Sequence, residues 1–274
     1  MNLFLAAALV AVATGLAVAA MLFVRRRAPE GSFFSDGDRA SGVFGVLATG
    51  FSILLGFVVF LAFSTYDTSR SGADVEAVTI FQQIETAQFF PPEVSGKLTG
   101  ELVCYGRSVV HEEWPRMEDG TLGDSVNPWG IELFRTIQGV EPRTAREQTA
   151  YDKWFDQTSE REQARLDRVH GAAGVIPTPL WIVIFFISIL IFGYMLFFAD
   201  SGERAKVQAM LMGAVVAVIT AMLLLLNFLD NPYRPGVGSL KPVAMERTLR
   251  ILDEALPRVD VQVDAPCDEA GRPS

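Results

Sequence analysis

Four long stretches without a charged side chain constrain this chain more than any other feature. Each is at least as long as the roughly 20 apolar residues that a helix needs to cross about 30 Å of hydrocarbon. In lipid every backbone N–H and C=O must be paired within its own segment, so four isolated apolar runs predict helices and not barrel strands. The predicted transmembrane helices are residues 1–24, 40–66, 175–199 and 207–229.

The first apolar run is expected to be a retained membrane anchor. No Lys or Arg precedes it, whereas Arg25, Arg26 and Arg27 follow it directly. A cleavable secretory signal has the opposite arrangement, with positive charge before its apolar part. The run therefore counts as a transmembrane helix.

The orientation follows from the short loops, because Lys and Arg are enriched in short cytoplasmic loops. Residues 25–39 carry four arginines, and residues 200–206 carry one Arg and one Lys. With both loops in the cytoplasm, the four spans place segment 67–174 and the tail 230–274 outside. The sequence thus predicts a multi-pass membrane protein with residues 67–174 extracytoplasmic, in the periplasm or its equivalent.

The second predicted span carries small residues at helical spacing. Gly45, Thr49, Ser52 and Gly56 follow one another at steps of 4, 3 and 4, which places them on one helical face. Small residues on one face permit close helix packing. Two interpretations remain open: an intramolecular packing seam, or a face that lines a pore. The fourth span has a similar row, and the third span, rich in Ile and Phe, is expected to face lipid.

Segment 67–174 is predicted to be helical. Apolar residues recur in it at steps of 3 and 4, and Pro and Gly separate the runs. The fold class is therefore all-α, with four transmembrane helices, a helical bundle inserted between the second and third, and a tail containing one helix. The helices expected in the bundle are 74–90, 93–113 up to Pro115, a short one at 129–137, and 142–169, with a turn-rich connection at 117–128.

The charge of this segment limits the partners of the protein. Residues 67–174 contain 19 acidic and 11 basic residues, a net charge of 11 − 19 = −8. Nucleic acids and anionic lipids are bound by basic surfaces. We therefore expect no nucleic-acid partner.

No catalytic constellation is recognisable. His111 and His170 are the only histidines, and neither has the second His four residues away that a zinc-binding helix requires. The sequence also lacks a glycine-rich phosphate loop, a Gly-x-Ser-x-Gly elbow and a Cys-x-x-Cys pair. We expect no enzyme, cofactor or metal. The spans lack the ionisable group that pumps place at membrane depth, whereas a channel can gate by dewetting between small and apolar residues.

Several strings resemble those of the bacterial bestrophin-like membrane proteins. They occur in that family's order over roughly residues 40–255. The chain departs from the family near the end of the second span, where only Arg70 remains of the usual basic residues. The strings are Ser64-Thr65-Tyr66-Asp67, Asp74-Val75-Glu76-Ala77, Tyr105-Gly106-Arg107-Ser108-Val109-Val110, Glu112-Glu113-Trp114-Pro115, Pro177-Thr178-Pro179-Leu180-Trp181, Leu229-Asp230-Asn231-Pro232-Tyr233 and Ser239-Leu240-Lys241-Pro242.

The resemblance implies a bestrophin-like integral membrane protein of the bacterial inner membrane. Bestrophins are oligomeric anion channels with a ring of second-span helices around the pore. The resemblance therefore suggests a homo-oligomeric ion channel, with the lipid bilayer and inorganic ions as partners. Bestrophins keep their bulk in the cytoplasm, which is opposite to the orientation that the short loops predict here. The alternative is a non-conducting structural or sensory membrane protein whose helical domain binds a partner.

Charged residues follow the second and fourth spans at similar distances. Asp67 is followed by Arg70, and Asp230 by Arg234, each about one turn later. Each Asp either pairs with a nearby Arg or caps a helix, or the carboxylates of several subunits form an acidic collar at the pore mouth. Such a collar would favour cations.

Cys104 and Cys267 would lie on the same, oxidising side of the membrane under the predicted topology. A disulfide is the less favoured of two possibilities. Cys104 lies within a predicted helix beside apolar neighbours, where a buried free thiol is commoner, and Cys267 lies in a tail that is expected to be mobile.

Overall fold

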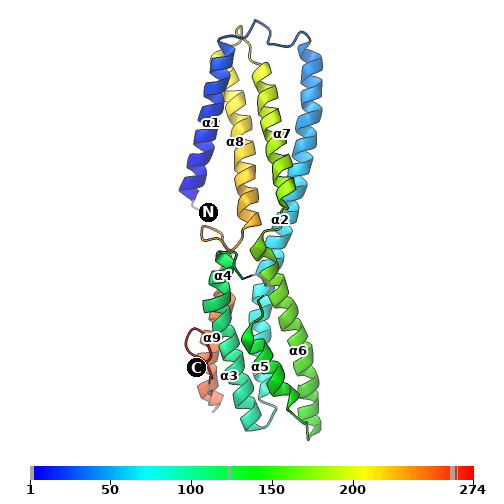
Figure 1. The fold of residues 1–274 in the computed structure, drawn as a ribbon, viewed down its shortest axis with the longest axis vertical. Coiled ribbons are helices and arrows are strands. Elements are labelled where there is room, and N and C mark those ends of the chain that lie inside the picture. Colours follow the sequence, from blue (N-terminus) through cyan, green and yellow to red (C-terminus); the bar gives the residue numbers. More distant parts are fainter. Residues whose placement is uncertain (1–2, 123–124, 260–262, 264) are drawn as a thin grey trace. The chain divides into compact units, whose positions relative to one another are not determined.

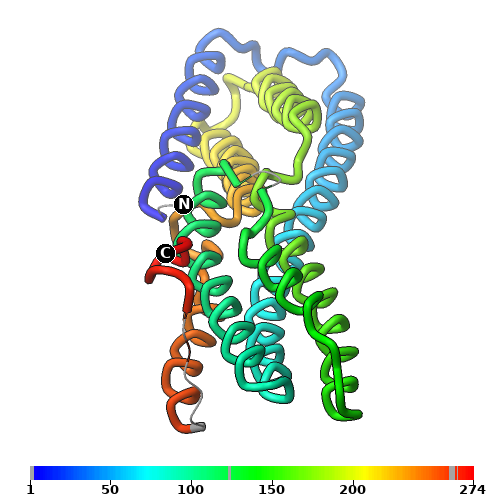
Figure 2. The backbone as a smooth tube through the Cα atoms, turned by 60° about the horizontal axis from the view of Figure 1, so that its bottom comes forward, coloured from blue at the N-terminus to red at the C-terminus, as the bar shows by residue number. Residues whose placement is uncertain are grey.

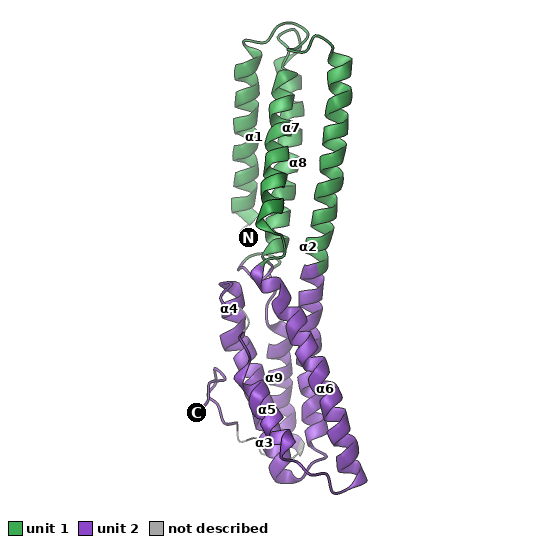
Figure 3. Ribbon diagram, turned by 45° about the vertical axis from the view of Figure 1, so that its right-hand side comes forward, with its two compact units in different colours: residues 1–64, 174–231, 236–238 green, residues 65–173, 232–235, 239–274 purple. Residues whose placement is uncertain are grey.

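The computed structural model of the chain describes residues 3–122, 125–259, 263 and 265–274. Met1 of the first predicted span and Gly123 of the predicted turn-rich connection lie outside these residues. The described residues form two compact units, coloured separately in Figure 3. Unit 1 comprises residues 1–64, 174–231 and 236–238, and unit 2 comprises 65–173, 232–235 and 239–274.

The regular structure of the described residues is helical apart from one isolated bridge between Cys267 and Pro273. Four helices, α1, α2, α7 and α8, are long and apolar enough to cross a membrane. The prediction of an all-α chain with four apolar helices is therefore confirmed. The α-helices in Figure 1 are α1 (Leu3–Arg25), α2 (Gly37–Ala87), α3 (Pro92–Ser108), α4 (Trp114–Glu118), α5 (Pro128–Gln138), α6 (Ala145–His170), α7 (Thr178–Phe197), α8 (Ala205–Asp230) and α9 (Val243–Ala255).

In unit 1, α1 packs along α8, with α7 beside them (Figures 1 and 2). Small residues of α8 allow this close approach: a Cβ atom on Gly213 would lie 3.3 Å from Thr14 and 3.5 Å from Val18 of α1. Met21 and Met212 fill the adjacent core. The small-residue row of the fourth span thus forms an intramolecular packing seam.

The second span and the first predicted helix of the bundle are one continuous helix, α2. The sequence suggested separate helices at 40–66 and 74–90, because Ser, Thr and Gly residues lie between them. The helix continues because this stretch is packed against α6 in unit 2. A Cβ atom on Gly72 would lie 2.7 Å from the carbonyl oxygen of Ala164 and 2.7 Å from the amide nitrogen of Arg168. Tertiary contact here outweighs weak helix propensity.

The core of unit 2 is built around α3, which packs against α5 and α9. The expected stop at Pro115 is wrong. A π-helical turn at Val109–Glu113 leads into α4, where Pro115 occupies the first turn. Pro115 thus lies where the π-helical turn passes into α4, and the helical backbone continues through it to Glu118.

Two polar side chains set the starts of later helices in unit 2. Asn127 Oδ1 accepts the N–H of Trp129 at 3.1 Å and caps α5. Thr144 Oγ1 accepts the N–H of Glu147 at 3.1 Å, so α6 begins at Ala145 and not at the predicted Pro142. Side-chain oxygens at these positions satisfy amide groups that a helix cannot pair internally.

Candidate functional site

The predicted small-residue face of α2 is exposed within the described chain. Gly45, Thr49, Ser52 and Gly56 are all exposed, and no atom lies within 4 Å of where a Cβ on Gly45 or Gly56 would be. At 3.6 residues per turn, this face lies about a third of a turn from the buried residues of the same span, Phe51, Leu55, Val58 and Ala62. The intramolecular seam of the described residues is formed by α8 and α1, and these four residues are not part of it.

The polar groups on this part of α2 are satisfied locally. Ser52 Oγ donates to the carbonyl oxygen of Ala48 at 2.9 Å, one turn earlier. Such a bond lets a hydroxyl lie in an apolar setting without an unpaired donor. Large apolar side chains are exposed next to the small face, including Val46, Ile53 and Phe60. A narrow small-residue strip thus runs beside a broad apolar surface on one helix.

Asp230 is buried and holds the entry to α7. Its Oδ1 accepts the N–H groups of Val175 and Ile176, both at 2.8 Å, and its Oδ2 accepts the indole N–H of Trp181 at 3.2 Å. Gly174, with a φ of 76°, makes the turn that presents the two amides. Three donors compensate the carboxylate, so its geometry is that of a capping group, the structural alternative for this residue.

The other three candidate mouth residues, Asp67, Arg70 and Arg234, are exposed. Within the ranges that the structure describes, none of the three forms an ion pair. Neither Asp pairs with the Arg that follows it: Asp230 acts as a cap, the other structural alternative, and the Asp67 carboxylate is exposed within the described chain.

A buried charge cluster in unit 2 was missed at the level of sequence. Arg168 of α6 is fully buried and donates to both oxygens of Glu76, at 2.5 and 3.0 Å, and to Glu113 at 2.6 Å. Arg165, one turn earlier, donates to the other oxygen of Glu113 at 2.9 and 3.1 Å. The Tyr105 hydroxyl donates to Glu76 at 2.7 Å. Two guanidinium groups and two carboxylates thus form a neutral, fully bonded cluster.

The cluster shifts the pKa values of its members in opposite directions. Burial alone would raise the pKa of Glu113, but the charges of Arg168 and Arg165 outweigh burial and hold that pKa below its ordinary value. Burial also raises the pKa of the Tyr105 hydroxyl, and the neighbouring Glu76 raises it further. Glu113 is therefore ionised and Tyr105 protonated at neutral pH, which is the state that the hydrogen bonds require.

The spacing of the arginines in α6 could have indicated a buried row of charges, but it also had another interpretation. Arg161, Arg165 and Arg168 recur at steps of 4 and 3, so they share one face of α6. A basic row just before an apolar span can also act as an orientation signal. The structure places all three toward the interior of unit 2, where Arg161 and Arg168 are fully buried.

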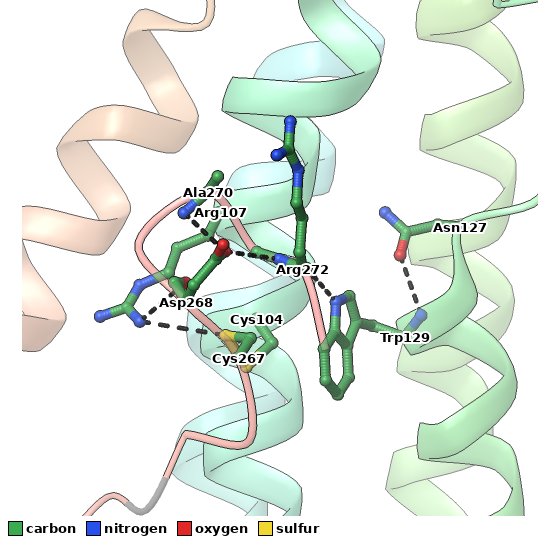
Figure 4. The surroundings of a disulfide bond; sticks show 9 residues. Cys104, Arg107, Asn127, Trp129, Cys267, Asp268, Ala270 and Arg272 are labelled. Carbon is green, nitrogen blue, oxygen red and sulfur yellow. Dashed lines mark hydrogen bonds between the residues drawn. A yellow bond between two sulfur atoms is a disulfide. The ribbon is translucent and has the colours of Figure 1, made fainter. Parts of the chain in front are cut away.

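Cys104 and Cys267 form a disulfide, which corrects the expectation of a buried free thiol and a mobile tail. Figure 4 shows the tail returning over α3, with the indole of Trp129 directed at the tail. That indole N–H donates to the carbonyl oxygen of Gly271 at 2.7 Å. Asp268 Oδ1 accepts the amides of Ala270 and Arg272 at 2.9 and 2.8 Å and closes the turn. Residues 265–274 lie against α3, which presents both a thiol and a surface for them.

No group of three or more His, Cys, Asp or Glu side chains with the geometry of a metal site occurs in the described part of the chain. The acidic residues of unit 2 that cluster are those already bonded to arginine.

Comparison with known proteins agrees with the resemblance in the sequence. The family model for the Bestrophin-like domain matches residues 11–245. A solved point mutant of a bacterial bestrophin homologue from Klebsiella pneumoniae has a TM-score of 0.69 at 14% sequence identity, covering 90% of this chain and 98% of its own. Another structure of a bacterial bestrophin homologue from Klebsiella pneumoniae has a TM-score of 0.65 at 15% identity, covering 92% and 98%. At these identities the likeness concerns the fold alone. No curated protein matches the chain.

Proposed function

Because the chain belongs to the bestrophin-like family, we propose that this membrane protein is a homo-oligomeric ion channel whose pore is lined by α2. The observation that carries the proposal is the uncovered small-residue face of α2, formed by Gly45, Thr49, Ser52 and Gly56. In the same unit, the small row of α8 is covered by α1. Because no element of the described chain covers the α2 face, it is available to line a pore shared by several copies.

The alternative is a non-conducting structural or sensory protein whose helical unit binds a partner. It would leave the α2 face buried against another copy, with no water along it. The two functions differ in a single measurement. Purified protein in liposomes carries an ion flux if it is a channel and none if it is not.

The pore assignment predicts different effects for two leucine substitutions on α2. Gly56→Leu places a large side chain on the proposed pore face and is expected to abolish most of the ion flux. Gly50→Leu is the matched control, because Gly50 is also exposed and open but lies on another side of the helix. It is expected to leave the flux near the wild-type level. Equal flux for both variants would show that this face does not line the pore.

Asp67 is proposed as the exposed carboxylate of an acidic collar, with Asp230 as the cap that fixes the entry to α7. We expect Asp67→Asn to reduce the cation-to-anion preference in low salt. The effect should fade above about 0.15 M salt, where the Debye length is roughly 8 Å. Asp152→Asn, at an exposed carboxylate of α6, serves as control. If Asp67→Asn leaves the cation-to-anion preference unchanged in low salt, Asp67 does not form an acidic collar.

We propose that segment 67–174 is extracytoplasmic, as the short basic loops suggest. The Cys104–Cys267 disulfide supports this side, because disulfides persist in the periplasm and not in the cytosol. Thr121→Cys should therefore react with an impermeant thiol reagent in intact cells, whereas Gly202→Cys should react only after lysis. The native cysteines are paired and give no background. Labelling of Gly202→Cys in intact cells would reverse the topology.

A further inference from the structure

Arg161 carries a buried positive charge that no carboxylate compensates within the described residues. Its side chain is 1% exposed. One terminal nitrogen donates to Gln83 Oε1 at 2.8 Å, and the guanidinium carbon lies 5.0 Å from the centre of the Tyr105 ring. The Nε atom is buried without a hydrogen-bond partner, and Arg161 takes part in none of the ion pairs found in the described ranges. The two carboxylates nearby in the fold, Glu76 and Glu113, are engaged by Arg168 and Arg165.

An unpaired buried charge is costly, and proteins rarely keep one unless a ligand or partner completes it. Arg161 also lines a cavity of about 410 Å³ between α5, α6 and the segment before α5. Arg165 lines it too, but its charge is paired with Glu113, and its Nε and Nη2 donate to Glu113 and to the carbonyl oxygen of Ser125. Arg161 is therefore the arginine of this cavity whose charge is not paired with a carboxylate of the described residues.

The rest of the cavity wall is largely apolar and open to solvent. Phe134 is 53% exposed and Leu166 60% exposed, and Ile131 and Val126 are exposed beside them. Such an apolar group around one buried polar anchor is the usual composition of a small-molecule site, and the volume lies in the usual range. Glu162, which is exposed and also lines the cavity, disfavours ligands with several negative charges.

We propose that this cavity binds a small organic monocarboxylate. The carboxylate accepts hydrogen bonds from the Arg161 guanidinium, and the apolar body of the ligand lies against Ile131, Phe134 and Leu166. An inorganic anion would satisfy the charge but leave the apolar wall in water. The site lies wholly within unit 2 and does not depend on whether the protein conducts ions.

Benzoate and hexanoate are suitable probes, with benzamide and benzyl alcohol as neutral controls of similar shape. Titration calorimetry on the full chain in detergent should give a Kd on the order of 1 mM for the carboxylates, as expected for a small ligand with one charged anchor. The neutral compounds should bind at least about tenfold more weakly, because they do not compensate the charge of Arg161.

Three variants separate the possibilities. Arg161→Gln should lose benzoate binding without a fall in melting temperature, because it removes an uncompensated charge. Arg146→Gln, at an exposed position on the same helix, should bind like the wild type. Gly130→Leu should block binding while keeping Arg161, because a Cβ at Gly130 would lie 4.0 Å from the Tyr105 ring and its side chain would enter the cavity.

Two outcomes would overturn the proposal. One is that wild-type protein binds neither carboxylate, or that Arg161→Gln binds them as well as the wild type does. The other is that Arg161→Gln changes the oligomeric state while benzoate does not bind, which would assign the free guanidinium to a carboxylate of a second copy of the chain.

Discussion

Arg168→Met is expected to lower the free energy of unfolding of unit 2 by about 3–5 kcal/mol, because it leaves the buried carboxylate of Glu76 without an ion-pair partner and leaves Glu113 with Arg165 alone. Glu76 is fully buried and takes two hydrogen bonds from Arg168, and Glu113 takes a third. Met fills a similar volume, so the loss comes from charge and hydrogen bonding more than from packing. Thermal unfolding in detergent measures the change.

Controls on the same helix and on the partners make this prediction specific. Arg146→Met removes an exposed arginine of α6 and should have little effect. Adding Glu76→Gln to Arg168→Met should recover part of the lost stability, because a buried amide costs less free energy than a buried carboxylate without a partner, while Glu113 keeps its pair with Arg165. A single Arg168→Met variant as stable as the wild type would mean that the cluster contributes no net stability.

Acid should act on the same cluster in the wild type. The pKa of Glu113 is lowered in the folded protein, so its contribution is fully present above the pKa of the unfolded chain. That contribution is lost as the pH falls through the lowered folded-state pKa. Arg168→Met should show a flatter dependence of melting temperature on pH over this acidic range.

Replacing both cysteines by serine is expected to cost about 2–5 kcal/mol of stability, because the disulfide closes a long loop in the unfolded chain. Cys104 and Cys267 are 163 residues apart in sequence. The tail after α9 should also become accessible to protease, since the bond fixes it beside α3. Non-reducing gels, limited proteolysis and thermal unfolding report the three consequences.

Reduction of the wild type provides the matched control for the serine variant. Dithiothreitol should lower the melting temperature of the wild type toward that of Cys104→Ser/Cys267→Ser and leave the variant unchanged. Two reactive thiols in the untreated, denatured wild type would contradict the disulfide.

The four apolar helices could be predicted from the sequence because a segment that crosses a lipid bilayer must be long and apolar, and both properties can be read from composition. The pairing of side chains was not predictable in the same way. Arg168 and Glu76 are 92 residues apart, and Arg168 and Glu113 are 55 apart, so no local spacing joins them. The disulfide was not predicted for a related reason: the sequence of a Pro-containing tail does not indicate which surface of the protein the tail packs against.

The strings that carried the family resemblance have structural roles in this chain. Glu76 and Glu113 hold the arginines of α6, and Asp230 holds the entry to α7. Recognition of the family was therefore right, although the residues behind it belong to the scaffold. The small face of α2 was found by spacing alone, and its exposure could be known only once α8 was seen to pack on α1.

The three hydrogen bonds of Asp230 also have a mechanical meaning. They fasten the end of α8 to the start of α7, while the short loop between the helices fastens their other ends. Two rods joined at both ends resist sliding along each other, so α7 and α8 form a stiff pair. A rearrangement of unit 1 that opens or closes a path would therefore cost least where this pair is spared and α2 shifts.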